Sequence, residues 1–82
     1  MKTVYFRPAA LGDLRKLDPQ VARRVMTAIA EYAESDRGTV KRLHGERSEF
    51  RLRVGDWRVR FEFERPDVIR ILRILHRSVA YR

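Results

Sequence analysis

Four arginines stand on the two arms of one segment, EFRLRVGDWRVRFEF, which occupies positions 49–63. Two alternating runs flank Gly55-Asp56, and this placement predicts a β-hairpin closed by a type II′ turn. In the resulting register arginine faces arginine twice, away from the core side of the hairpin, with Arg53 opposite Arg58 and Arg51 opposite Arg60. A guanidinium group makes bidentate hydrogen bonds to phosphate oxygens, so this face has the chemistry of a polyanion-binding surface.

Like charges that lie directly opposite each other destabilise a sheet. In water, two unit charges about 4 Å apart repel by only about 1 kcal/mol, and salt screens them further. A basic face that merely keeps one side of the sheet soluble is therefore one interpretation. Side chains of alternating charge would give the same solubility without repulsion. An unfavourable pairing of like charges without visible compensation therefore favours a functional site. Lys41, in the preceding VKRLHG, adds another solvent-exposed cation.

The C-terminal HRSVAYR supplies His76, Arg77 and Tyr81. They follow the last predicted strand, so we expect them to emerge at one end of the sheet and fold over the same concave face. A histidine, several arginines and an accessible aromatic ring together suit metal-independent RNA cleavage. There the ribose 2′-OH attacks its own phosphate, one proton is removed, another is donated, and the phosphorane charge is stabilised. A surface histidine without function and a tyrosine that anchors the terminus are the alternatives.

Charge and composition narrow the class of protein. The 82 residues carry a net charge of +8 and a sequence pI near 11, which biases the chain towards polyanions. Residues 37–82 hold thirteen basic and six acidic side chains, so the binding chemistry is expected there, with a coding bias towards arginine as the alternative. Cysteine is absent, which excludes disulfides and thiolate chemistry. No apolar stretch has the length of a membrane span, and MKTVYFRPAA lacks the apolar core of a secretory signal, so we expect a soluble cytoplasmic protein.

The elements that position these residues follow from periodicity. Residues 2–6 read as a short strand, and residues 9–17 and 19–34 as two antiparallel helices, the second with Asp18-Pro19 as N-cap and first position. Residues 39–48 read as a linker, residues 49–63 as the hairpin, and residues 68–75 as a central strand after a Pro-Asp turn. This order predicts one α+β domain over residues 1–82, β-α-α-β-β-β(-α), with the two helices packed on a mainly antiparallel four-stranded sheet.

Three stretches of the chain resemble the RelE/ParE superfamily of toxins from bacterial type II toxin–antitoxin systems. They are VKRLHG, EFRLRVGDWRVRFEF and ILRILHRSVAYR. RelE-like members cleave mRNA in the ribosomal A site without a metal ion, and an antitoxin neutralises them and helps to repress their operon. ParE-like members share the fold and poison DNA gyrase. The resemblance therefore implies an endoribonuclease that inhibits translation, with a gyrase inhibitor as the alternative and an inactive toxin serving as co-repressor as a third possibility.

The resemblance also implies roles for particular residues. Arg51 and Arg53 fall on the basic positions of the second strand, Arg58 would stabilise the phosphorane, Arg77 would help to protonate the leaving 5′-oxygen, and Tyr81 would stack on a nucleotide. Lys41 and Arg60 are expected to bind RNA phosphates. Arginine stands where the RelE prototype has lysines and is a poor general base, so either His76 takes that role or Arg53 only binds phosphate. No metal or cofactor is implied. At +8 we also expect an acidic, partly disordered antitoxin that covers the basic face and through which the complex binds operator DNA.

Overall fold

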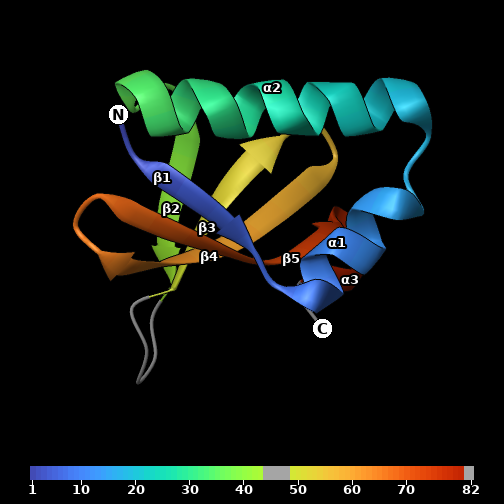
Figure 1. The fold of residues 1–82 in the computed structure, drawn as a ribbon. Helices are drawn as coiled ribbons and strands as arrows, with labels where there is room; N and C mark the ends of the chain where they lie inside the picture. The colour runs from blue at the N-terminus through green and yellow to red at the C-terminus, as the bar shows by residue number, and fades with distance from the viewer. Residues whose placement is uncertain (44–48, 81–82) are drawn as a thin grey trace.

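The computed structural model of the chain describes residues 1–43 and 49–80. Its elements follow in the order β1 (Thr3–Phe6), α1 (Pro8–Arg15), α2 (Pro19–Ser35), β2 (Thr39–Leu43), β3 (Glu49–Val54), β4 (Trp57–Arg65), β5 (Val68–His76) and α3 (Arg77–Ala80). The strands form one sheet in the order β1-β5-β4-β3-β2, in which β1 runs parallel to β5 and the remaining pairs are antiparallel (Figure 1). The predicted α+β class and mainly antiparallel sheet are confirmed.

The sheet has five strands rather than the predicted four, because part of the expected linker is a strand. Residues Thr39–Leu43 pair with β3 along their whole length, with Val40 opposite Leu52. Lys41 and Arg42 are both exposed, and charged side chains of this kind are common on edge strands, where they oppose pairing with another chain. The rest of the expected linker, residues 44–48, lies outside the described residues.

The β3–β4 hairpin has the predicted register, with Arg53 opposite Arg58 and Val54 opposite Trp57. Gly55 has a φ of 58°, whereas Asp56 is not among the described residues with positive φ. A type I′ turn needs positive φ at both central positions, so the turn is type II′, as predicted.

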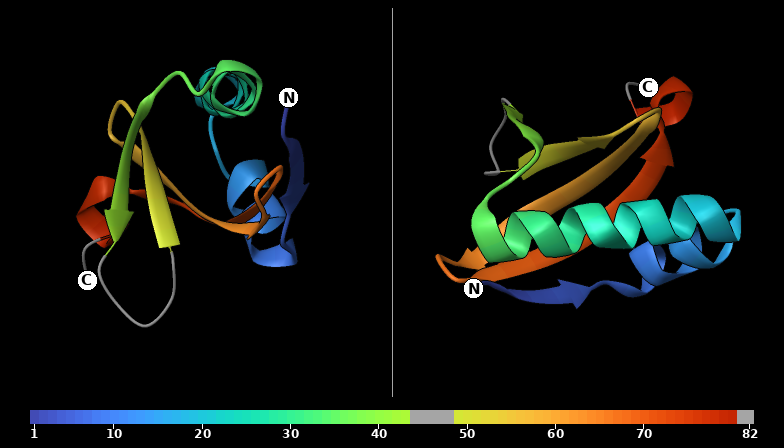
Figure 2. Two further views of the ribbon diagram at one scale, coloured as in Figure 1. Left: turned by 90° about the vertical axis from the view of Figure 1, so that its left-hand side faces the viewer. Right: turned by 90° about the horizontal axis from the view of Figure 1, so that it is seen from above.

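The core lies between the helices and one face of the sheet. Figure 2 shows α2 crossing over the strands on this face. The sequence DPQ begins this helix as predicted: Asp18 accepts a hydrogen bond from the Gln20 amide and Pro19 takes the first helical position. The buried apolar side chains come from both helices and from three strands; they are Ala10, Val25, Ile29, Ala33, Leu52, Val59, Phe61, Ile69, Ile71 and Ile74.

An irregularity in β5 fixes α1 to the sheet. Arg73 pairs with Arg60 and Ile71 with Phe61, so Leu72 is an extra residue on β5. Beside it, the carboxylate of Asp13 on α1 accepts hydrogen bonds from the Arg73 guanidinium, at 2.8 and 3.1 Å, and from the Ile74 amide, at 2.9 Å. Burial opposes the charge on Asp13, but these hydrogen bonds and the charge of Arg73 outweigh it, so that the pKa of Asp13 is lowered.

Candidate functional site: a basic hollow on the open face of the sheet

Four of the predicted site residues line one hollow. The hollow has a volume of about 180 Å³ and is bordered by Thr39, Lys41, Arg51, Arg53 and Arg58, which we call the basic hollow. The register explains the convergence, because Thr39, Arg53 and Arg58 form one row across β2, β3 and β4, next to the row that begins with Lys41 and Arg51. Neighbours in such rows point to the same face of a sheet. This face is the one opposite α2 (Figure 2).

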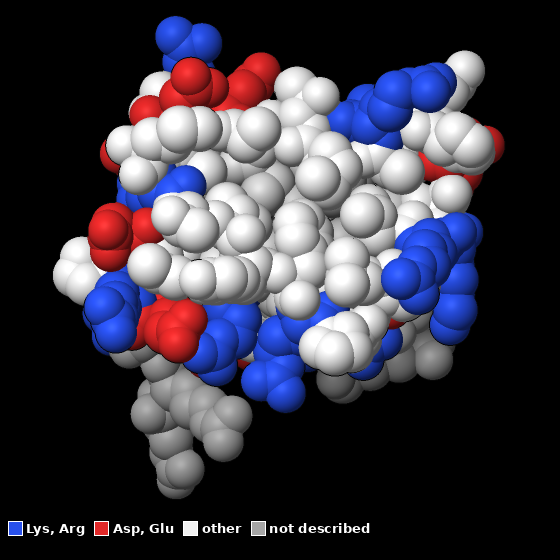
Figure 3. All heavy atoms as spheres, in the orientation of Figure 1, with Lys and Arg blue, Asp and Glu red and all other residues white. Residues whose placement is uncertain are grey.

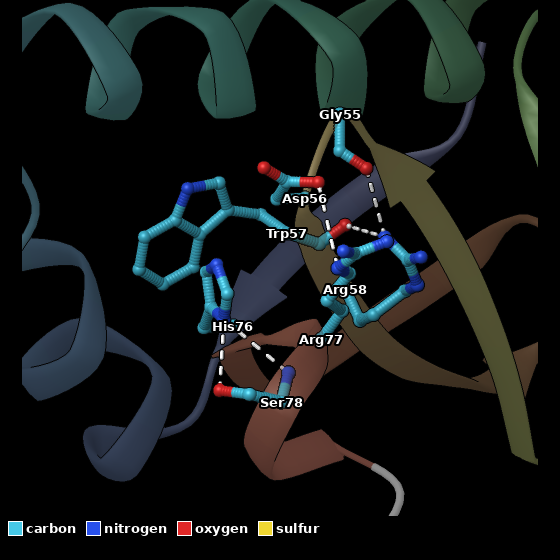
Figure 4. A network of polar contacts seen from close by, with 7 residues as sticks. All are labelled: Gly55, Asp56, Trp57, Arg58, His76, Arg77 and Ser78. Atoms are coloured by element: carbon cyan, nitrogen blue, oxygen red, sulfur yellow. Dashed lines mark hydrogen bonds and ion pairs between the residues drawn. The ribbon is translucent and has the colours of Figure 1, made fainter.

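Arg58 forms the rigid floor of the basic hollow. Its side chain is buried, with a residue exposure of 7%, and one terminal nitrogen, Nη1, donates to the carbonyl oxygens of Gly55 at 2.9 Å and Trp57 at 3.0 Å. Figure 4 shows the guanidinium turned back towards the hairpin turn. The backbone of the turn therefore fixes the position of this charge.

Lys41 and Arg53 form the open rim. Both residues are exposed, whereas Arg51 between them is half-buried. Within residues 1–43 and 49–80, neither Lys41 nor Arg53 makes an ion pair or a side-chain hydrogen bond. An anion that enters the hollow would therefore meet two accessible cations at the rim and a fixed one at the floor.

Arg60, predicted to bind phosphate, is separated from the hollow by an ion pair. Its guanidinium forms a bidentate contact with Glu49 on β3, at 3.0 Å from Nε and 2.8 Å from Nη2. Arg73 is likewise held by Asp13. In the row Lys41–Arg51–Arg60–Arg73, the arginines of β4 and β5 are therefore each paired with a carboxylate.

His76 lies on the other face of the sheet. It is the last residue of β5 and pairs with Trp57, which places both side chains on the helix-bearing side. The two rings meet edge-on at 84°, with their centroids 5.3 Å apart. The expectation that His76 folds over the arginine face is therefore wrong, because the strand extends one residue further than predicted and its alternation turns the imidazole away.

The C-terminal residues of the predicted site are only partly described. Arg77 opens α3, and its amide donates to the Asp56 carbonyl at 2.8 Å, while its Nε lies 3.7 Å from the Asp56 carboxylate. Both side chains of this ion pair are largely exposed. Tyr81 lies outside the described residues. Thr39 was missed by the sequence analysis, and its position opposite Arg53 follows only once β2 is known to be a strand.

Charged side chains are unevenly distributed over one face of the molecule. The face drawn in Figure 3 is uncharged across most of its centre, with Lys and Arg side chains gathered at its margins. Among the described residues, no group of three or more His, Cys, Asp or Glu side chains is arranged to hold a metal ion. None of the helices in the described part of the chain has the length and apolar character of a membrane span.

Comparison with known proteins assigns the chain to a class of toxins. Residues 4–81 match the sequence model of one protein family. This family is described as ParE toxin of type II toxin-antitoxin system, parDE. The chain belongs to this family, and its structural relatives place it in the RelE/ParE superfamily of type II toxins. A comparison with curated proteins gives no match.

Solved structures of RelE toxins share the whole fold. The chain is similar to the RelB–RelE antitoxin–toxin complex from Methanococcus jannaschii, with 26% identity, a TM-score of 0.75 and 93% of each chain covered. The RelBE2 toxin–antitoxin complex from Mycobacterium tuberculosis gives 30% identity and a TM-score of 0.69, covering 92% of this chain and 96% of that one. The RelE–RelB complex from Pyrococcus horikoshii gives 29% identity and a TM-score of 0.72, covering 96% of this chain and 98% of that one.

Proposed function

We propose that this toxin is an endoribonuclease that cleaves mRNA without a metal ion and thereby inhibits translation. The observation that carries the proposal is the convergence of Lys41, Arg51, Arg53 and Arg58 from three strands on one hollow of about 180 Å³. A hollow that is lined by cations and open to solvent suits a phosphodiester and the extra negative charge that its cleavage creates.

The residues of the hollow suit different parts of the reaction. Arg58 is fixed by two carbonyl oxygens and stabilises the phosphorane without having to reorganise. Arg53 and Arg51 bind the phosphates on either side of the cleaved bond. Lys41 is the side chain of the basic hollow whose neutral form accepts a proton, which a guanidinium does not do, so Lys41 is our candidate for removing the proton from the 2′-OH.

The tail completes the proposed site. Arg77 follows β5 next to the hairpin turn and assists protonation of the leaving 5′-oxygen, and Tyr81 stacks on a nucleotide. We place cleavage in the ribosomal A site, in the cytoplasm, by analogy with the RelE toxins whose fold this chain shares. The same relatives are complexes of RelE with RelB, which supports a cognate antitoxin for this chain. An acidic antitoxin, partly disordered when alone, would neutralise the basic hollow and carry the complex to operator DNA.

RNA cleavage by the purified protein tests the proposal, with mRNA on ribosomes in magnesium buffer and, in parallel, with free RNA in EDTA. We expect new RNA 5′ ends by primer extension on the ribosome-bound mRNA, and their loss in Arg53→Ala and Lys41→Ala. Cleavage of free RNA in EDTA would show directly that no metal ion is needed. Arg23→Ala is the matched control, because Arg23 is an exposed arginine on α2 and does not line the hollow. If both single variants, Arg53→Ala and Lys41→Ala, cleave RNA like the unaltered protein, the basic hollow is not the cleavage site.

A gyrase inhibitor is the second candidate. Two observations favour it: the family model that matches is the ParE toxin model, and the imidazole of His76 lies away from the hollow. Induced expression separates the two functions. A gyrase inhibitor induces the SOS response and accumulates gyrase cleavage complexes before translation falls, whereas a ribonuclease arrests translation first. A co-repressor without toxic activity would leave growth unchanged although the protein is folded.

A further inference from the structure

His76 stands at the junction between the last strand and the C-terminal helix. Its ring nitrogen Nδ1 accepts a hydrogen bond from the Ser78 amide at 3.2 Å and lies 2.9 Å from Ser78 Oγ. Ser78 is the second residue of α3, and a side chain that precedes a helix and accepts from its second amide is an N-cap. The imidazole therefore satisfies one of the amides that the first turn of α3 leaves without a partner.

This contact defines which nitrogen of the neutral ring carries the proton. An amide donates to Nδ1, so Nδ1 presents its lone pair and the proton belongs on Nε2. The edge-on contact with Trp57 holds the ring in the same orientation. The lone pair that a general base would use is thus already engaged, on the face of the sheet opposite the basic hollow.

The helix capped by His76 is tied to the turn that holds Arg58. Arg77 donates its amide to the Asp56 carbonyl, and Arg58 donates to the carbonyl of the adjacent Gly55. Figure 4 shows both arginines gathered at this turn, with the rings of His76 and Trp57 to their left. The start of α3 therefore sets where Arg77 lies relative to the fixed charge of Arg58.

We propose that His76 is a positioning residue: it caps α3 through Nδ1, with its proton on Nε2, and so places Arg77 beside Arg58 instead of taking a proton from the substrate. The part of this proposal that concerns activity rests on the proposed ribonuclease function. The part that concerns the cap does not, and it is tested separately.

Nuclear magnetic resonance of the full chain tests the cap. Long-range ¹H–¹⁵N spectra should show the proton of the neutral His76 ring on Nε2, and the Ser78 amide should exchange slowly. Slow exchange should persist in His76→Asn, because the asparagine oxygen replaces Nδ1 as an N-cap, and should be lost in His76→Gln, whose amide is one carbon further out. A proton on Nδ1, or a Ser78 amide that exchanges equally in both variants, overturns the proposal.

RNA cleavage by the same variants tests the role in activity. We expect His76→Asn to cleave like the unaltered protein, and His76→Gln and His76→Ala to be about fivefold slower, the effect of one lost N-cap. A general base would instead make all three variants slower by about 10²-fold or more, and that result overturns the proposal. If His76→Ala does not fold, the comparison of His76→Asn with His76→Gln still tests the role in activity. If neither the unaltered protein nor any variant cleaves RNA, the proposed function fails, and the exchange of the Ser78 amide still tests the cap.

Discussion

Arg53 and Arg58 lie directly opposite each other on β3 and β4, and yet Arg53 is exposed while Arg58 is buried. The difference arises because Arg58 donates to the carbonyls of the turn, whereas Arg53 extends to solvent. The second like-charged pair is relieved differently, since Glu49 takes Arg60 away from Arg51. In each arginine pair the member on β4 is thus held in place, Arg58 by backbone carbonyls and Arg60 by Glu49. The members on β3, Arg51 and Arg53, line the basic hollow.

Arg53→Ala should weaken binding to single-stranded RNA without changing stability. Because it removes one phosphate contact, the slope of log affinity against log salt should become shallower by about 0.7. Fluorescence anisotropy at several salt concentrations measures both quantities, with Arg23→Ala as the control that leaves them unchanged. An unaltered slope in Arg53→Ala would show that this side chain does not contact phosphate.

Replacement of Arg58 should destabilise the hairpin as well as abolish activity. Arg58→Ala loses hydrogen bonds from a charged, buried donor to two carbonyls, which we expect to cost about 1.5–3 kcal/mol of unfolding free energy. Urea denaturation followed by the fluorescence of Trp57, the single tryptophan, measures the loss. Because Arg58→Ala also loses stability, its loss of activity has to be compared with that of Arg53→Ala, which stays stable. Equal unfolding free energies of the two variants would contradict the role of Arg58 as a fixed charge at the floor of the hollow.

Arg60→Ala should reduce RNA affinity less than Arg53→Ala does, since Arg60 is committed to Glu49. Glu49→Gln should have the opposite effect, because it releases a cation next to Arg51 and should tighten RNA binding. A double-mutant cycle on unfolding free energy should give a coupling of about 1 kcal/mol between Arg60 and Glu49. Equal losses of RNA affinity in Arg60→Ala and Arg53→Ala would show that Arg60 contacts the RNA.

Asp13→Asn should destabilise the protein in a pH-dependent way. The folded-state pKa of Asp13 is lowered, so its stabilising contribution is complete above the unfolded-state pKa of about 3.9 and is lost as the pH falls through the folded-state value. We expect Asp13→Asn to cost about 1.5–3 kcal/mol from pH 5 to 8, and the difference to vanish in strong acid. Urea denaturation at a series of pH values checks this, and a difference that persists in strong acid would contradict it.

Gly38→Ala should destabilise the entry into β2. Gly38 has a φ of 138°, and an added Cβ would lie 2.7 Å from Cδ1 of the buried Leu52. The backbone strain and the clash together should cost about 1–3 kcal/mol. Gly12→Ala is the matched control, because a Cβ there meets nothing within 4 Å and its helix gains propensity. Thermal unfolding of the two variants should shift in opposite directions.

The sequence was sufficient to predict the hairpin, because period-two alternation around Gly55-Asp56 determines both the register and the face of each side chain. It was insufficient for β2, because adjacent Lys41-Arg42 interrupts the alternation and an edge strand is defined by a partner elsewhere in the chain. Parallel pairing of β1 with β5 also depends on long-range packing and has no local signal.

The site was predictable to the same extent as the strands that carry it. Arg51, Arg53 and Arg58 share a face by alternation, and Lys41 joins them once β2 is known. The Arg60–Glu49 contact is diagonal across the hairpin, and diagonal neighbours depend on side-chain reach rather than on register. His76 would have been assigned to the helix side if the strand had been extended by one residue beyond Leu75.

The position of β5 in the sheet has a consequence for biosynthesis. β1 leaves the ribosome first, but its one neighbour in the described sheet is β5, the last strand, which also lies between β1 and β4. A fragment whose synthesis stops before Val68 therefore lacks an interior strand and leaves its amino-terminal strand without a ladder to join. Products that end before Val68 cannot retain the complete sheet, so the working fold requires synthesis through β5.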